Sequence, residues 1–270
     1  MVTSINTNPG SNIGLQSLNK TNNGLDALRE RLATGKKING PTPDPSTFAI
    51  AQKLLGEIGG TVAVKEGLNA AEATTGVAIS AGQAVSDLLV DLKGIAIKAS
   101  QDGLDATSRQ ALETEFNALR DQIGTVVDSA SFNGTNLIQA GGGGLDVLAS
   151  ENGDRFNVAA QDLSAGGLGI AGLTLGTAAD AVNAVNALDV AVSDASARLA
   201  DLGASAKRIE TQADATTKLT DSLRQGVGNL VDADLGADAA ALAAGQVRQS
   251  LGVQALNIAN SAPRYLTELF

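Results

Sequence analysis

The sequence predicts a mainly α-helical protein, an elongated helical bundle or coiled coil formed by the N- and C-terminal halves, with a small Gly-rich β-hairpin region in the middle. The first observation is a heptad repeat: every seventh residue from Val185 and from Leu188 is aliphatic up to residue 230, except Thr216 and Thr220. Such a repeat is typical of long helices packed along one seam. The second is that aromatic residues make up only 2% of the chain, and the third is that Gly and Asn-Gly pairs gather in residues 131–177.

The composition also excludes several classes of function. The chain has no Cys, so it has neither a disulfide framework nor thiolate metal sites, and it has no His, the commonest general base and metal ligand. The formal charge of −10 argues against a nucleic acid or an anionic membrane as partner. We therefore expect no cofactor, no metal site and no membrane insertion.

The first predicted helix covers about residues 11–34, and Gly35 follows as a stop signal. Its leucines form one apolar stripe, with one further leucine beside it: Leu18, Leu25, Leu28 and Leu32, with Leu15 next to them. Residues 35–52 hold three of the five prolines and predict an ordered connector. Lys36 and Lys37 within it are interpreted as a solvated turn rather than a binding site.

Two helices are expected next, over about 60–100 and 105–130. The first repeats small and aliphatic residues in heptads, which predicts close approach of a neighbouring helix. The Gly clusters at 141–144 and 166–172 lack the Lys and Ser/Thr that a phosphate-binding loop requires, so flexible turns are the better interpretation. Short apolar stretches between them predict β-hairpins. The longest predicted helix, with the heptad repeat, covers 178–230.

The C-terminal helix carries two apolar stripes where a surface helix needs only one. An advance of about 100° per residue places Val247, Leu251 and Ile258 on one stripe. Leu242, Val253 and Leu256 lie on another, more than about 90° away. The first helix can cover one stripe, and we expect other copies of the same chain to cover the other. The predicted interface residues are Leu15, Leu18, Leu25, Leu28, Leu32, Leu242, Val247, Leu251, Val253, Leu256, Ile258, Leu266, Leu269 and Phe270.

Several segments resemble bacterial flagellins. "LRERLATGKKING" followed by "FAIAQ" is similar to the N-terminal signature of that family, "SFNGTNLI" to the motif that opens its β region, and residues 231–270 to its C-terminal block. The resemblance covers both ends and the central helices. Large flagellins insert further outer domains in the middle, and the shortness of this central region indicates that they are absent.

The resemblance implies a self-assembling structural subunit of the extracellular flagellar filament, the propeller for swimming, without enzymatic activity. Residues 1–40 and 232–270 would pair as a discontinuous inner coiled-coil domain, and residues 41–231 would form an outer-tube helical domain with the β-hairpin region at about 131–177. Export through the flagellum-specific type III apparatus would replace a signal peptide. Partners would be other copies, filament cap and hook-junction proteins and an export chaperone.

One segment departs from the family pattern. In flagellins sensed by Toll-like receptor 5, an Arg-rich, Glu-containing stretch lies where this chain reads "LVDLKGIAIKA". Asp91 stands in place of an Arg and Gly94 in place of the Glu. The segment that includes Leu88, Asp91, Lys93 and Gly94 is therefore expected to be a weakened receptor site.

Two alternatives stay open at this point. A hook–filament junction protein has ends that resemble those of flagellin, and a heptad hairpin could be the rod of a signalling receptor, although such rods need an anchor or a partner-binding tip. An enzyme would have to rely on loop carboxylates such as Asp146, Glu151 and Asp154, which are spread over turns with no His nearby. Catalytic residues are therefore expected to be absent.

Overall fold

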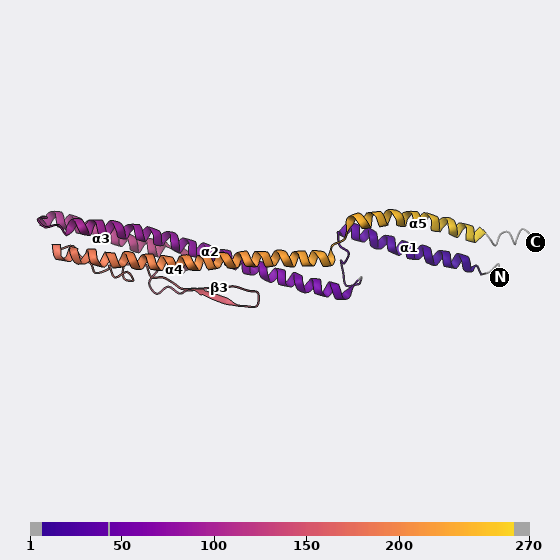
Figure 1. Cartoon of the computed structure of the whole chain (residues 1–270), viewed down its shortest axis with the longest axis horizontal. Helices are drawn as coiled ribbons and strands as arrows, with labels where there is room; N and C mark the ends of the chain where they lie inside the picture. Colours follow the sequence, from indigo (N-terminus) through magenta and orange to yellow (C-terminus); the bar gives the residue numbers. More distant parts are fainter. Residues whose placement is uncertain (1–6, 43, 262–270) are drawn as a thin grey trace, which may run out of the picture. The chain divides into compact units, whose positions relative to one another are not determined.

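The computed structural model describes residues 7–42 and 44–261. Its helices are α1 (Pro9–Thr34), α2 (Pro45–Ala99), α3 (Ala106–Ser129), α4 (Ala178–Val231) and α5 (Leu235–Ser261), and its strands are β1 (Ser131–Phe132), β2 (Thr135–Asn136), β3 (Leu145–Leu148) and β4 (Arg155–Val158) (Figure 1). The predicted mainly helical fold with a small β region is confirmed. The chain packs as two compact units: residues 1–56 with 222–270 (unit 1), and residues 57–221 (unit 2).

Helix α1 begins and ends with local signals in the sequence. The Asn8 side-chain oxygen accepts a hydrogen bond from the Ser11 amide at 3.1 Å, and Pro9 fits the first turn because no helical partner exists there for its missing N–H. Gly35 ends the helix in the left-handed conformation, with φ of 69°, and its amide donates to the Arg31 carbonyl at 2.8 Å. Only a residue without Cβ adopts this conformation at little cost.

Helix α2 begins earlier than predicted. The connector expected over 35–52 ends at Asp44, because the Asp44 carboxylate accepts hydrogen bonds from the amides of Ser46 and Thr47, both at 3.1 Å, and so caps a helix that starts at Pro45. The Thr47 hydroxyl donates to the same carboxylate at 2.6 Å. These bonds, above all the one from the Thr47 hydroxyl, hold the pKa of Asp44 below its usual value. The prolines suggested a break, whereas Pro45 occupies a first turn that tolerates it.

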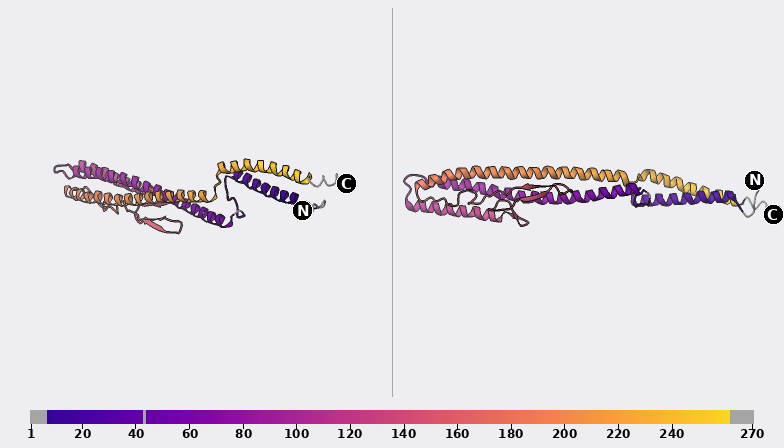
Figure 2. Two further views of the ribbon diagram at one scale, coloured as in Figure 1. Left: turned by 45° about the vertical axis from the view of Figure 1, so that its right-hand side comes forward. Right: turned by 90° about the horizontal axis from the view of Figure 1, so that it is seen from below.

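Unit 2 is built on the seam between α2, α3 and α4 (Figure 2). All three helices contribute fully buried side chains, as do the segments between α3 and α4; those from the helices include Leu89, Leu92, Phe116, Ile123, Leu188 and Leu202. At Gly82 a Cβ atom would lie 2.6 Å from Cδ2 of Leu199 and 2.9 Å from Cδ1 of Leu163. A side chain there would collide with the core, so this glycine permits the close approach that the small heptad residues predicted.

The two threonines that interrupt the heptad repeat lie in the seam. Thr216 and Thr220 are both 5% exposed. Each hydroxyl donates to the carbonyl one turn earlier, on Gln212 and Thr216 respectively, at 2.8 Å. The Thr220 hydroxyl also lies 3.2 Å from that of Thr61 on α2. Both hydroxyls therefore have hydrogen-bond partners within the bundle, as buried polar groups require.

The central region forms two hairpins, as the Gly and Asn-Gly pattern predicted. β1 pairs antiparallel with β2 through Asn133 and Gly134, whose φ angles of 49° and 79° fit a turn with two left-handed residues. β3 pairs antiparallel with β4, with Leu145 opposite Val158. Two contacts hold the second hairpin to α4: the Arg208 guanidinium lies 4.3 Å from the centre of the Phe156 ring, and the Gln212 amide donates to the Ala149 carbonyl at 2.7 Å.

The irregular segment after β4 is fixed by arginines. Arg198 of α4 donates to the carbonyls of Asp162 and Gly167, the latter at 3.0 Å. Arg120 of α3 donates to the Leu173 carbonyl at 2.9 Å. Guanidinium groups have several donors in a fixed plane, so one side chain can satisfy two loop carbonyls. The segment therefore has a defined path over the helices in spite of its glycines.

Candidate assembly surface on the terminal helices

Helices α1 and α5 pack side by side in unit 1 (Figures 1 and 2). Leu25 of α1 is 1% exposed, and Gly245 is buried opposite it on α5. A Cβ atom at Gly245 would lie 2.6 Å from Cδ2 of Leu25. The absence of a side chain at this position brings the two helices together and defines the face of α5 that α1 covers.

Polar contacts fix the pair as antiparallel along its length. The Asn8 amide nitrogen donates to the Ala259 carbonyl at 2.7 Å, so the start of α1 lies beside the end of α5. Gln249 donates to the Asn22 side chain at 2.7 Å near the middle. Arg31 lies 3.8 Å from the Asp238 carboxylate at the other end.

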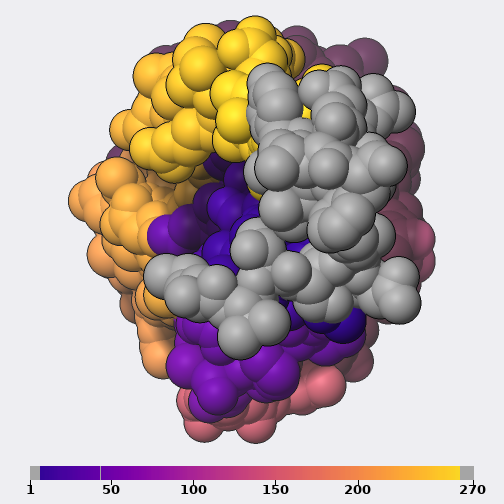
Figure 3. Space-filling model, turned by 90° about the vertical axis from the view of Figure 1, so that its right-hand side faces the viewer, coloured from indigo at the N-terminus to yellow at the C-terminus, as the bar shows by residue number. Residues whose placement is uncertain are grey.

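The opposite side of α5 is left uncovered within unit 1. Val247, Leu251 and Ile258 are 60%, 58% and 71% exposed, although all three are large aliphatic residues. Figure 3 faces the end where α1 begins and α5 ends, and α5 (yellow) lies at the upper edge of this view. Apolar residues gathered on one face usually mark an interaction surface. We call these three residues the outer stripe of α5.

The other predicted interface residues have different environments. Leu15 of α1 is 47% exposed and Val253 of α5 is 44% exposed. Leu25 is buried, and five more are half-buried beside the helix–helix contact: Leu18, Leu28, Leu32, Leu242 and Leu256. Leu266, Leu269 and Phe270 lie outside the described residues. Ile13, which is 68% exposed, was not among the predicted interface residues. The helical step places it about 120° from Leu25, off the buried stripe, and this angle is the signal that could have found it.

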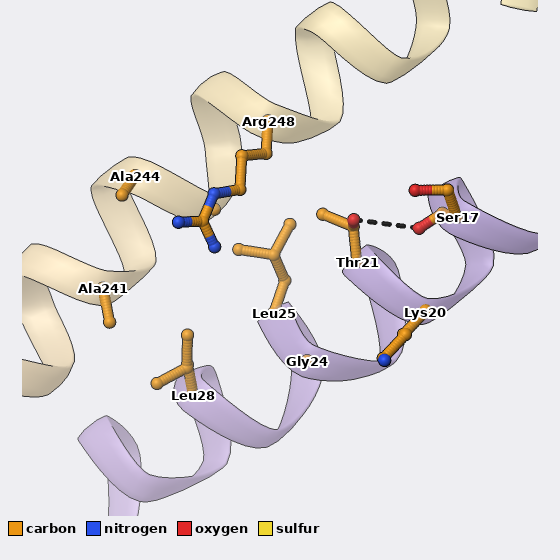
Figure 4. A pocket seen from close by; sticks show the side chains of 10 residues that line it. Ser17, Lys20, Thr21, Gly24, Leu25, Leu28, Ala241, Ala244 and Arg248 are labelled. Carbon is orange, nitrogen blue, oxygen red and sulfur yellow. Dashed lines mark hydrogen bonds between the residues drawn. The ribbon is translucent and has the colours of Figure 1, made fainter. Parts of the chain in front are cut away.

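A groove of about 370 Å³ runs between α1 and α5 (Figure 4). Its floor is apolar and includes Leu25, Leu28, Ala241, Ala244 and Gly245, whereas Lys20 and Arg248 supply two cations at its edge. Arg248 extends from α5 toward Leu25 of α1 (Figure 4). Ser17 and Thr21 line the remaining side, where the Thr21 hydroxyl donates to the Ser17 carbonyl at 2.9 Å.

The loop carboxylates considered for catalysis serve the local structure of the second hairpin. Asp146 accepts from the Asn157 amide at 2.9 Å across the strands, and Asp154 accepts from the Ser150 hydroxyl at 2.7 Å in the turn. Glu151 lies against Gly60 of α2, where its side-chain oxygen would be 2.8 Å from an added Cβ. Over residues 7–42 and 44–261, no cluster of three or more potential metal ligands occurs. In the same ranges no helix is long and apolar enough to cross a membrane.

The receptor-like segment lies on α2 within unit 2. Leu88 packs partly buried against the core, and Asp91 is exposed. Lys93 forms an ion pair with Asp189 of α4. No atom lies within 4 Å of a Cβ built on Gly94, so the surface there is open.

Comparison with known proteins identifies the family. Residues 5–141 match the bacterial flagellin N-terminal helical region, and residues 185–270 match the bacterial flagellin C-terminal helical region. The chain is 41% identical to flagellin FljM of Caulobacter vibrioides over 268 residues, which cover 99% of this chain and 98% of that protein. It is 30% identical to a flagellin of Brucella melitensis over 280 residues, with 99% of both chains covered.

Solved structures share the fold at lower identity. A crystal structure of Bacillus cereus flagellin matches with a TM-score of 0.52 and 21% identity, covering 56% of this chain and 88% of that one. A putative flagellar hook-associated protein from Vibrio parahaemolyticus matches with a TM-score of 0.60 and 13% identity, covering 70% of this chain and all of that one. At these identities the two structures show only that the helical fold is shared. The family is shown by the sequence relatives that match over their full length. This chain belongs to the bacterial flagellin family and is a structural subunit of the extracellular flagellar filament.

Proposed function

We propose that this flagellin polymerises by burying the outer stripe of α5, together with Ile13 and Leu15 of α1, against other copies of the chain. The observation that carries the proposal is that α1 covers one face of α5 and leaves Val247, Leu251 and Ile258 at least 58% exposed on the other. A face of large aliphatic residues is costly to leave in water, and contact with identical subunits removes it from water.

Burial of this surface contributes favourable free energy to assembly. Full burial of one Val, Leu or Ile side chain contributes about 1.5–3 kcal/mol. Three such residues on α5, with Ile13 and Leu15 on α1, therefore supply several kcal/mol for each copy, before the cost of fixing the subunit. Identical heterologous contacts that do not close into a ring build an open helical filament, so the same surface is used at every addition.

The proposed assembly surface also assigns the two parts of the chain to an inner and an outer domain of the filament. Residues 1–40 and 232–270 act as the inner coiled-coil domain, and residues 41–231 act as the outer-tube domain. The pairing of α1 with α5 in unit 1 and the separate core of unit 2 support this division. The carboxylates of the β region stabilise turns, and the chain performs no catalysis.

The test replaces apolar residues of the outer stripe. Leu251→Asp combined with Ile258→Asp leaves the contact with α1 intact, so we expect a helical monomer that does not polymerise under conditions in which the parent chain forms filaments. Gln246→Asp, at an exposed polar position about 100° or more around the same helix from the outer stripe, is the control and should still polymerise. Filaments are scored by electron microscopy and sedimentation, and helicity by circular dichroism.

A truncation gives an independent test. Removal of residues 252–270 deletes part of the outer stripe and the apolar residues that follow, and we expect a helical monomer without filaments. Normal filaments from either the truncated chain or the doubly substituted chain would refute burial of α5 as the assembly mechanism.

We also propose the route and partners of assembly that the family resemblance suggests. The chain leaves the cell through the flagellum-specific type III apparatus with an export chaperone, and it adds beneath the filament cap, distal to the hook-junction proteins. The test is secretion in cells without a functional flagellar export gate. Retention of the chain inside these cells is expected, and its undiminished appearance in the medium would contradict the route.

Activation of Toll-like receptor 5 should be weak. Asp91 is exposed where the recognised flagellins carry an Arg, and Gly94 has no side chain where they carry a Glu. Lys93 is engaged by Asp189, so its charge is partly neutralised. In a receptor reporter assay, Asp91→Arg with Gly94→Glu should raise the response. A parent response equal to that of a recognised flagellin would disprove this expectation.

A further inference from the structure

Two cations, Lys20 and Arg248, line the groove between α1 and α5. Among the residues that the structure describes, neither Lys20 nor Arg248 forms an ion pair or a side-chain hydrogen bond. Two other cations of α1 do have acidic partners: Arg29 pairs with Asp26 at 2.8 Å and Arg31 with Asp238 at 3.8 Å. In a chain with a net charge of −10, two uncompensated cations at one groove indicate an acidic ligand.

The floor of the groove defines the rest of the ligand. Gly24, Ala241, Ala244 and Gly245 project little or no side chain, and the half-buried Leu28 supplies apolar surface beside them. The groove thus has room for an aliphatic side chain, with the cations of Lys20 and Arg248 at its margin. The matching ligand is one exposed aliphatic residue flanked by carboxylates.

An exposed aliphatic residue flanked by carboxylates occurs at the start of α5, on the surface of unit 1. Leu235 is 50% exposed, and Asp232 and Asp234 beside it are exposed as well. Asp234 caps α5 by accepting from the Ala237 amide at 3.0 Å, and no described cation forms an ion pair with it. No described residue forms an ion pair with Asp232. We call Asp232, Asp234 and Leu235 the acidic corner.

We propose that the acidic corner of one copy docks into the Lys20–Arg248 groove of a second copy, with Leu235 over the apolar floor and the two carboxylates facing the two cations. The inference rests on the proposed assembly of unit 1. It adds one defined contact between copies, in which the carboxylates of the acidic corner meet the cations of the groove. The corner cannot enter its own groove, because Leu235 and Gly245 belong to one continuous helix and lie about 15 Å apart along it.

This contact joins two different patches of the same molecule. Such a heterologous contact leaves a free groove on one copy and a free acidic corner on the other, so it can be repeated without limit. Complementary charges also accelerate encounter and fix the register of docking. Since salt screens exposed charges, we expect the critical concentration for polymerisation to rise with ionic strength if this contact contributes.

The test reverses the charges on each side. The groove variant is Lys20→Glu with Arg248→Glu, and the corner variant is Asp232→Lys with Asp234→Asn, in which Asn retains the helix cap. Each variant alone places like charges together, so its critical concentration should rise by about tenfold or more. An equimolar mixture of the two should copolymerise, because each groove then meets an oppositely charged corner. A single chain with all four changes should polymerise within about threefold of the parent concentration.

Two controls separate this inference from the proposed function. Arg29→Glu with Lys98→Glu alters net charge as much as the groove variant but lies outside both the groove and the acidic corner, and it should polymerise normally. Circular dichroism of each monomer establishes that the fold is retained. If the outer-stripe variant abolishes filaments while both charge variants polymerise like the parent, assembly through α5 stands and the groove contact is wrong. The groove contact is also overturned if neither the mixture nor the four-change chain recovers, or if the control variant fails equally.

Discussion

Leu25 of α1 lies directly against Gly245 of α5, where a Cβ atom would stand 2.6 Å from the leucine Cδ2 and 3.3 Å from its Cγ. Leu25 is 1% exposed, so it has little room to retreat. This relationship fixes the rotation of α5 about its own axis. It thereby determines that the stripe with Val247, Leu251 and Ile258 faces away from α1.

The first prediction concerns this contact. Gly245→Ala should destabilise the α1–α5 pair by about 1–3 kcal/mol, because the added methyl overpacks a filled interface. The double variant Gly245→Ala with Leu25→Ala should be less destabilised than the sum of the two single variants, because the smaller residue makes room. Thermal unfolding and hydrogen exchange of the α1 amides measure the effect.

Gly24→Ala is the matched control, since no atom lies within 4 Å of a Cβ at Gly24. It should leave the pair unchanged or stabilise it, because Ala favours the helix more than Gly does. A Gly245→Ala variant as stable as this control would contradict the close contact.

The second prediction separates two roles of Asn8. Its oxygen caps α1 through Ser11, and its nitrogen donates to the Ala259 carbonyl at 2.7 Å. Asn8→Asp keeps the cap and loses the second bond, whereas Asn8→Ala loses both. We expect the first turn of α1 to open least easily in the parent, more easily in Asn8→Asp and most easily in Asn8→Ala. Loss of the cap should lower the free energy of opening by about 1 kcal/mol. Hydrogen exchange at the Ser11 and Asn12 amides gives the order, and equal exchange in the parent and in Asn8→Asp would show that the Ala259 bond contributes nothing.

The third prediction concerns Arg198 in unit 2. Arg198→Met removes the donors to the carbonyls of Asp162 and Gly167 and leaves both without their partner. Loss of a partner for a partly buried carbonyl costs about 1–3 kcal/mol. The amides of Leu168 and Ile170, which bond within this loop, should exchange faster. Arg155→Met at an exposed position of β4 is the control, and equal protection of the loop in the two variants would disprove the role of Arg198.

The fourth prediction is a pH dependence at the start of α3. The Ser108 hydroxyl, with the Ser108 and Thr107 amides, donates to the Asp105 carboxylate and holds its pKa below the usual 3.8. Because the folded-state pKa is the lower one, the stabilisation is complete above the unfolded value and is lost as pH falls through the folded value. Asp105→Ala should therefore lower the melting temperature at neutral pH and much less at about pH 2.

Asp105→Asn tests the same site without a titrating group. Asn caps a helix about as well as Asp, so the melting temperature of this variant should stay close to that of the parent at neutral pH. As pH falls, its melting temperature should decrease less than that of the parent, because position 105 no longer titrates. Thermal melts followed by circular dichroism at several pH values compare the three chains. A constant difference between parent and Asp105→Ala down to about pH 2 would exclude the titration of Asp105 as its cause.

The start of α2 shows where local patterns mislead. Three prolines in five residues predicted a connector up to residue 52, but Pro45 occupies a first turn and Asp44 supplies the cap. The Ser/Thr-rich sequence after Asp44 was the available signal, since it provides the donors for a capping carboxylate. The heptads of α4 needed no such correction, because a repeat sustained over many turns outweighs single residues.

Local sequence patterns predicted the mainly helical fold, the turn at Asn133 and Gly134 and the helix stop at Gly35, because periodicity, capping and turn chemistry act between residues close along the chain. Sequence motifs also indicated the flagellin family, and the helical step showed that α5 carries two apolar stripes. The packing of the folded chain was needed to see which stripe α1 covers, that Arg198 holds the loop at Asp162 and Gly167, and that Lys20 and Arg248 line one groove. These depend on how helices distant in sequence are rotated and shifted against one another. That arrangement is set by close packing such as Leu25 on Gly245, which no local pattern encodes.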